Sequence, residues 1–168
     1  MKQCYLGVLI ALLLNIQVLP VHAQETAGAA KPALEAATFS EITIYRSERC
    51  GCCTRWGERL EAAGFTIKDM VVEDMDGLKQ ANGITPELSS CHTGMVADYV
   101  VEGHVPPDSI KRMLRERPKI RGLTAPGMPM GSPGMETEGV QAEAFDVLAI
   151  ANDGTTTVFD RISPESSH

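Results

Sequence analysis

The pattern of apolar and polar positions predicts alternating strands and helices in the first two thirds of the chain. Residues 41–45 alternate polar side chains with β-branched and aromatic ones, which is typical of a strand. A helix is expected next, because apolar residues recur at intervals of three and four at Cys53, Trp56, Leu60 and Ala63. Residues 65–72 predict a second strand, and Asp74 is placed to cap a second helix.

The middle of the chain predicts two more strands and another helix. Pro86 opens a short helical turn. Residues 95–102 are strand-like and are expected to form a hairpin that bends near Asp98. A helix that opens at Pro106-Pro107-Asp108 ends before Pro118, which cannot continue it. This order of elements, with a cysteine-containing turn between the first strand and the first helix, predicts an α/β thioredoxin-like sandwich.

The last third of the chain departs from that order. Residues 118–135 are rich in proline and glycine and predict a loop. Two strands are expected over residues 145–151 and 155–162, because the turn Asn152-Asp153-Gly154 between them is a strong hairpin signal. The expected fold class is therefore α/β, a thioredoxin-like sandwich with a C-terminal β-hairpin extension.

The N-terminal residues 1–23 predict a secretory signal peptide. Lys2 supplies a positive charge ahead of an apolar stretch over residues 6–19, and Ala23 ends a Val-His-Ala sequence that suits signal peptidase. A membrane anchor would need roughly 20 apolar residues, and this stretch is shorter. We therefore expect export, cleavage after Ala23, and no membrane attachment afterwards.

The exported chain is expected to hold one domain. Residues 24–39, which are rich in alanine, predict a flexible leader. Residues 40–163 are expected to form the domain, which includes a methionine-rich loop at residues 124–136. Residues 164–168 form a short tail.

Charge excludes one class of partner. The 168-residue chain has 15 Lys and Arg residues against 22 Asp and Glu residues, a formal net charge of −7. Phosphate binding depends on clustered Lys and Arg, and the sequence has no basic stripe, so nucleic acid is not an expected partner. An acidic surface attracts cations, but it also simply keeps a protein soluble.

Four cysteines remain once Cys4 leaves with the signal, and three of them fall within four residues: Cys50, Cys52 and Cys53, with Cys91 as the fourth. An even number of cysteines in an exported protein usually forms structural disulfides. A cluster this tight is a poor framework for stapling a domain, so we interpret it as a chemical site. Its place between a strand and a helix favours thiolates, through the helix dipole.

The central Cys52 favours metal binding over thiol redox chemistry. A dithiol oxidoreductase needs one attacking and one resolving sulfur, and a third sulfur in the same turn would compete with both. Three thiolates in one turn can instead bridge soft metal ions, and Cu(I) is the soft ion that thiolates prefer. Two alternatives stay open. The Cys50/Cys53 pair could serve a thiol–disulfide oxidoreductase or isomerase, and a four-cysteine zinc module is the third possibility, which this spacing fits poorly.

Cys91 and His92 are expected to complete the site. In the predicted sandwich, the loop that enters the third strand packs beside the cysteine turn, and here residues 89–93 read Ser-Ser-Cys-His-Thr. Cys91 is therefore predicted to lie next to the other three cysteines. His92 is counted as a candidate ligand, with a surface role as the equal alternative. His104 could be a ligand or a capping residue, and a structural role is favoured.

The methionine-rich loop supplies three further candidate ligands: Met128, Met130 and Met135. Thioether sulfur binds Cu(I) and suits few other biological ions. Methionines in an exposed Gly/Pro loop gain little from packing, although one of them could plug the core. Four other methionines lie on apolar faces and are predicted to be core residues: Met70, Met75, Met95 and Met113.

Taken together, these motifs resemble the CopG-like copper-resistance proteins, formerly grouped as a domain of unknown function. The resemblance spans residues 41–150. It rests on the Cys-Gly-Cys-Cys cluster followed by Trp56, on Cys91-His92-Thr93, on residues 99–106 and on the Pro-Gly-Met-Pro-Met-Gly-Ser-Pro-Gly-Met segment at residues 126–135.

The resemblance implies a periplasmic protein of Gram-negative bacteria with a thioredoxin-like fold, whose domain at residues 40–163 binds copper. It implies a multinuclear Cu(I)–thiolate site formed by the family's cysteines, here Cys50, Cys52, Cys53 and Cys91. The implied role is copper tolerance, with interconversion of Cu(I) and Cu(II) as a further implied activity. The expected partners are copper ions and other periplasmic copper-handling proteins. Whether the protein turns over as a copper or thiol oxidoreductase is left open.

Overall fold

Seven strands and three α-helices make up residues 41–164, the part of the chain that the computed structural model describes. The predicted signal peptide, the leader and residues 165–168 of the tail lie outside it. No helix within residues 41–164 has both the length and the apolar character needed to cross a membrane. The elements follow in the order β1 (Glu41–Arg46), α2 (Gly51–Ala62), β2 (Thr66–Val71), α3 (Met75–Ala81), the 3-10 helix η1 (Pro86–Leu88), β3 (His92–Val96), β4 (Tyr99–Gly103), α4 (Pro107–Glu116), β5 (Gly122–Ala125), β6 (Phe145–Ile150) and β7 (Thr156–Ile162).

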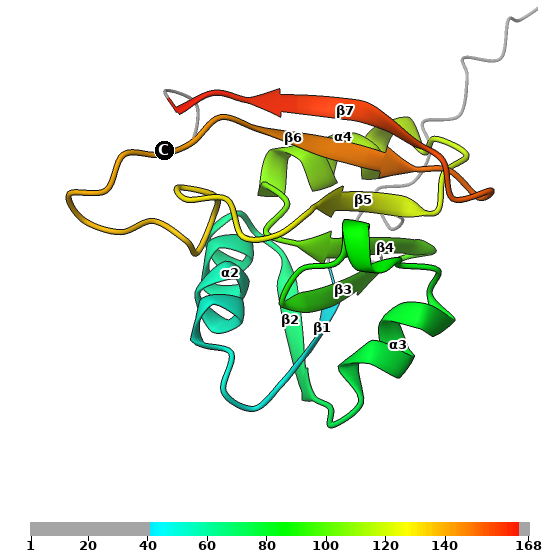
Figure 1. Ribbon diagram of the computed structural model, residues 1–168, viewed down its shortest axis with the longest axis horizontal. Coiled ribbons are helices and arrows are strands. Elements are labelled where there is room, and N and C mark those ends of the chain that lie inside the picture. Colours follow the sequence, from blue (N-terminus) through cyan, green and yellow to red (C-terminus); the bar gives the residue numbers. More distant parts are fainter. Residues whose placement is uncertain (1–40, 165–168) are drawn as a thin grey trace, which may run out of the picture. The chain divides into compact units, whose positions relative to one another are not determined.

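The strands form one mixed sheet in the order β2-β1-β3-β4-β5-β6-β7 (Figure 1). β1 pairs with β2 and β4 pairs with β5 in parallel, because α2 and α4 supply the helical crossovers that parallel strands need. The remaining neighbours are antiparallel. The α/β class is therefore confirmed.

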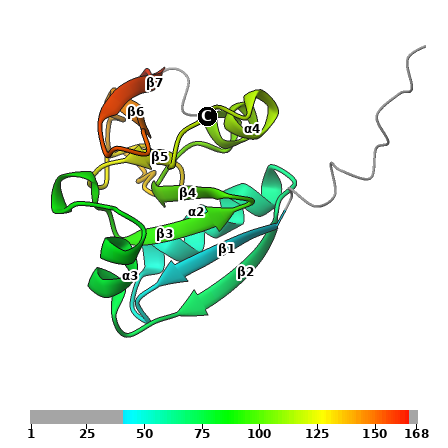
Figure 2. The same cartoon turned by 90° about the vertical axis from the view of Figure 1, so that its right-hand side faces the viewer.

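Helices α2 and α4 cover one face of the sheet, and α3 lies on the other face (Figure 2). The larger core cluster includes fully buried residues from both α2 and α4: Trp56, Leu60, Ile110 and Met113. Val101 belongs to this cluster, whereas its neighbour Val100 packs with Ile84 and Ile150 in a smaller cluster. Because successive strand residues face opposite sides, the two clusters lie on opposite faces. Figure 2 shows α2 and α3 on different sides of β1 and β3.

Both predicted hairpins are confirmed. β3 and β4 pair around the predicted bend, where Ala97 has a φ of 50°. β6 and β7 pair around the turn that contains Gly154, which has a φ of +87°, a conformation that glycine adopts without strain. This second hairpin pairs through β6 with β5, so it extends the same sheet.

Two predictions are wrong. The predicted loop over residues 118–135 contains β5, a strand of four residues that is buried because it pairs on both sides. A strand of only four residues, flanked by prolines and glycines, shows too little apolar periodicity to be predicted from the sequence. Met70 was predicted to be a core residue, but its side chain is 39% exposed because β2 is an edge strand. Met113 is fully buried as predicted, while Met75 and Met95 are half-buried.

Leu60→Ala is expected to lower the free energy of unfolding by about 2–5 kcal/mol, because it leaves a cavity in the larger core cluster. Glu58→Ala changes an exposed position of the same helix and should have an effect below about 0.5 kcal/mol. Urea denaturation of both variants measures the difference. Equal stability of the two variants would contradict the assigned core.

Candidate metal centre

The cysteine turn, residues 47–53, links the end of β1 to the start of α2. Cys50 is the N-cap residue of α2, and its side chain makes no capping hydrogen bond. Cys53 is fully buried and Cys52 is half-buried. The first turn of α2 carries no acidic residue, so the positive end of the helix dipole acts on these sulfurs without a competing carboxylate.

Four sulfur atoms come together at the cysteine turn, all within 4.8 Å of one another. Cys50 and Cys53 are joined in a disulfide, with their Cα atoms 5.4 Å apart. Cys52 Sγ lies 3.6 Å from Cys50 Sγ and 3.6 Å from Cys91 Sγ. Cys91 therefore lies beside the cysteine turn, where the sequence analysis placed it. The role of the four sulfurs as metal ligands stays a prediction.

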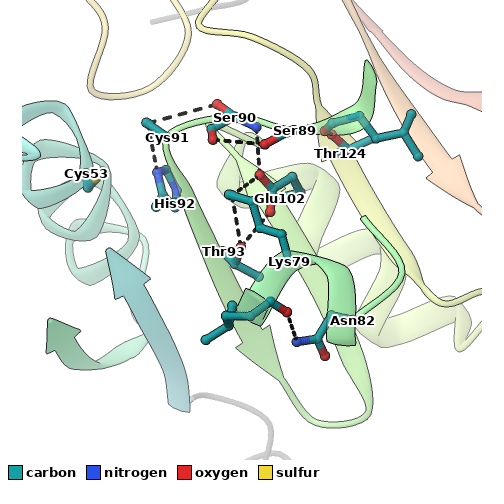
Figure 3. A network of polar contacts seen from close by, with 12 residues as sticks. Cys53, Lys79, Asn82, Ser89, Ser90, Cys91, His92, Thr93, Glu102 and Thr124 are labelled. Carbon is teal, nitrogen blue, oxygen red and sulfur yellow. Dashed lines mark hydrogen bonds and ion pairs between the residues drawn. The ribbon is translucent and has the colours of Figure 1, made fainter. Parts of the chain in front are cut away.

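Two imidazole rings contact the sulfur of Cys91. His104 Nε2 lies 3.1 Å and His92 Nδ1 lies 3.3 Å from Cys91 Sγ (Figure 3 shows the His92 contact). The Nδ1 atom of His104 donates to the carbonyl oxygen of Pro133 at 2.8 Å. This hydrogen bond places the ring proton on Nδ1 and leaves the lone pair of Nε2 directed at the sulfur. Histidines that bind metals are held in the same way.

Burial lowers the pKa of both imidazoles. The pKa of His92 lies well below its usual value, because of burial first and then the nearby His104 and Lys79. Burial is also the largest cause of the lowered pKa of His104. Both rings are therefore neutral at neutral pH, which is the form that binds metal ions.

The Nε2 atom of His92 is buried and has no hydrogen-bond partner among the described residues. A buried polar atom without a partner is costly, which makes this atom a candidate for a ligand. The ring itself is fixed by its neighbours. Trp56 packs against it with ring centroids 4.3 Å apart, and His104 meets it edge-on at 4.9 Å.

Burial also raises the pKa of the Cys91 thiol to about 12, and the proximity of Cys52 adds to the effect. Cys91 is therefore protonated at neutral pH. A metal ion that binds there must displace this proton, and its positive charge would compensate the buried thiolate.

The donors form two groups that share Cys91. One group is the four cysteines, and the other is Cys91 with His92 and His104. Thiolate selects soft ions such as Cu(I) and also zinc, and imidazole is compatible with both metals. This donor set fits a soft metal ion, so the cluster could hold one.

The methionine-rich loop packs its backbone against this cluster at Pro133 and Gly134. Arg55 Nε donates to the carbonyl oxygen of Gly134 at 2.9 Å. Gly134 has a φ of +86°, and a Cβ atom there would lie 2.6 Å from the backbone nitrogen of Trp56. Glycine therefore allows the loop to approach the first turn of α2 closely.

The three predicted methionine ligands differ in exposure. Met128 is 52% exposed, whereas Met130 and Met135 are half-buried. Met135 directly follows Gly134, so its backbone lies beside the cluster. A ligand role for the three side chains stays a prediction.

The sequence analysis did not predict the contact between His104 and Cys91, because it favoured a structural role for His104 over a ligand role. The register of the β3–β4 hairpin was the signal that could have found it. Thr93 pairs with Glu102, and the same register continued by two residues sets Cys91 opposite His104. This pairing requires a two-residue turn at Ala97-Asp98, which is within one residue of the predicted bend near Asp98.

Comparison with known proteins identifies the family to which this chain is similar. Residues 88–135 match the family model described as "Protein of unknown function, DUF411". Two solved structures of a copper resistance protein, CopG, are similar to this chain at 40% sequence identity. Form 1 has a TM-score of 0.68 and the match covers 73% of this chain and 96% of that chain. For Form 2 the TM-score is 0.69 and the coverage is 73% and 98%. No curated protein matches the chain.

Cys91 in the metal-free protein is expected to react slowly with iodoacetamide near neutral pH, because the thiolate is the reactive form. With a pKa of about 12, its alkylation rate should rise about tenfold per pH unit up to about pH 11. Mass spectrometry of the Cys91 peptide measures the rate, and urea-unfolded protein is the control. A folded-state rate that levels off near pH 9, as for an ordinary thiol (pKa about 8.5), would contradict the assigned burial.

Proposed function

Because the chain belongs to the family of the CopG copper resistance proteins, we propose that it binds copper for copper resistance, as Cu(I) and with more than one ion per chain. The observation that carries the proposal is the convergence of four cysteine sulfurs on the N-terminus of α2. Neutral imidazoles of His92 and His104 extend the same donor set.

The proposal of several ions follows from the sharing of sulfurs. Cys52 Sγ is equally close to Cys50 and Cys91, and Cys91 also contacts both imidazoles. Thiolates that lie this close together can bridge adjacent Cu(I) ions, which accept soft donors at low coordination number. Met128, Met130 and Met135 are proposed to add thioether ligands from the loop above the cluster.

The Cys50/Cys53 pair, which is joined in a disulfide here, gives the site a two-electron dithiol/disulfide couple for copper redox chemistry. Closing the disulfide from two thiols releases two electrons and two protons, which is sufficient to reduce two Cu(II) ions to Cu(I). Opening it consumes two electrons and two protons and gives two thiols, which lose their protons when they bind a metal ion as thiolates. Interconversion of Cu(I) and Cu(II) is therefore part of the proposal.

The finer fold class and the location belong to the same proposal. The β1-α2-β2 unit, the β3–β4 hairpin and α4 follow the predicted order, which supports a thioredoxin-like sandwich with a C-terminal hairpin. Export through the signal at residues 1–23 would place the protein in the periplasm. Other copper-handling proteins there are the proposed partners for copper exchange.

A thiol–disulfide oxidoreductase is the second candidate function. It is favoured by the Cys50–Cys53 disulfide at a helix N-terminus, a position that activates thiolates. Against it stands Cys52, whose sulfur lies 3.6 Å from Cys50 Sγ and would divert mixed disulfides into internal ones.

Anaerobically reduced protein is expected to bind more than one Cu(I) per chain, and Cys52→Ser should lower this number because it removes a bridging sulfur. Thr54→Ala, an exposed neighbour on α2, is the control and should bind as the wild type does. Chelator competition and metal analysis provide the count. Absence of tight copper binding, retention of one zinc ion instead, or equal binding by Cys52→Ser would contradict the proposal.

Copper-free protein is expected to catalyse insulin reduction poorly, and Cu(I) should abolish the remaining activity because it occupies the thiolates. Cys52→Ala leaves a simple Cys-x-x-Cys and should raise the rate while weakening copper binding. The turbidity assay for insulin reduction compares the wild type with Cys52→Ala, and chelator competition measures their copper affinity. High wild-type activity, together with unchanged copper affinity in Cys52→Ala, would make the second candidate the better one.

A further inference from the structure

A buried ion pair lies on the face of the sheet opposite the cysteines. Lys79 of α3 contacts the carboxylate of Glu102 on β4, and their side chains are 8% and 0% exposed. A buried ion pair is weak grounds for stability, because the loss of solvation offsets most of its attraction. Such a pair has to be explained by what its hydrogen bonds hold in place.

The carboxylate of Glu102 binds the chain on both sides of Cys91 (Figure 3). Its Oε1 atom accepts a hydrogen bond from the backbone nitrogen of Ser90 at 2.7 Å. Its Oε2 atom accepts from the hydroxyl of Thr93, also at 2.7 Å. Lys79 Nζ donates to the same hydroxyl at 3.1 Å. One buried group therefore fixes both ends of the Cys91-His92 dipeptide.

Ser90 connects this network to the methionine-rich loop. Its hydroxyl donates to the carbonyl oxygen of Gly127, and the backbone nitrogen of Gly127 donates to Ser89 at 3.1 Å. Gly103 has a φ of +74°, and a Cβ atom there would lie 2.6 Å from the hydroxyl of Ser90. Ser90 is thus held tightly from the side of the sheet and from the side of the loop.

We propose that Glu102 is a positioning residue of the metal centre, which holds the Ser90–Thr93 segment so that the sulfur of Cys91 faces Cys52. Lys79 supplies the charge that lets the carboxylate stay buried. The relevance of this to copper rests on the proposed function, whereas the positioning itself does not. The important element is the hydrogen-bond acceptor at position 102, not the ion pair.

Two double variants distinguish the effect of the hydrogen-bond acceptor at position 102 from the effect of the ion-pair charges. Lys79→Met with Glu102→Gln removes both charges and keeps a carbonyl that accepts from Ser90. Lys79→Met with Glu102→Leu removes both charges and the acceptor, which leaves the Ser90 amide unpaired. Both replace a buried ion pair with groups of similar volume, a change that proteins often tolerate. Thermal unfolding confirms that each variant is folded.

The readout is the rate at which diamide joins Cys52 to Cys91 in protein that keeps the Cys50–Cys53 disulfide. Diamide accepts the two electrons and two protons that the thiols lose, and peptide mapping identifies the bond. The sulfurs lie 3.6 Å apart in the wild type. We expect the Gln variant to react within about twofold of wild type and the Leu variant to react about tenfold more slowly. Equal rates for both variants would overturn the proposal.

Amide hydrogen exchange of the wild type gives a test that needs no variant. The Ser90 amide should exchange at least about a hundredfold more slowly than in an unfolded chain, because a buried acceptor holds it. Exchange at the unfolded rate would overturn the assignment.

The copper affinity of the two double variants is a separate result. It is measured by chelator competition, with Cys91→Ser as the control. Wild-type protein that cross-links as expected but binds no copper contradicts the proposed function and leaves the positioning role intact.

Discussion

The antiparallel pairing of β1 with β3 is the constraint on which the candidate site depends. Arg46, the last residue of β1, pairs with His92, the first residue of β3. The cysteine turn that leaves β1 and the loop that enters β3 must therefore meet at the same end of the sheet. The β3–β4 register then brings His104 to that end as well. Backbone pairing thus brings four sulfurs and two imidazoles from three separate segments to one end of the sheet.

Because side chains alternate along β3, the two faces of the sheet have different roles. His92 points toward α2 and packs on Trp56, while Thr93 points toward α3 and binds Glu102. The α2 face carries soft, neutral donors in an apolar surrounding, which raises the pKa of Cys91 and lowers that of His92. The opposite face carries the charged network that holds the chain. The candidate metal-binding side chains and the side chains that hold the chain in place are thus adjacent in sequence but lie on opposite faces of the sheet.

The sequence predicted the parts of the fold that depend on local signals. Apolar spacing located α2, and the Asn152-Asp153-Gly154 turn located the last hairpin. The proximity of Cys91 to the other cysteines followed from the order of elements. Glu102 and His104 were not found, because their partners depend on the exact register of β3 against β4. β5 was missed because four residues among prolines and glycines carry almost no periodicity, and their burial comes from neighbours distant in sequence.

The central claim is that the sulfurs at the N-terminus of α2 hold copper, and anomalous diffraction at the copper edge tests it most directly. Crystals of reduced protein loaded with Cu(I) would locate each ion independently of any assumed ligand. We predict more than one copper peak enclosed by the sulfurs of Cys50, Cys52, Cys53 and Cys91, with His104 Nε2 alongside. Copper found only on surface carboxylates, with the Cys50–Cys53 disulfide intact and no peak at the cysteines, would contradict it.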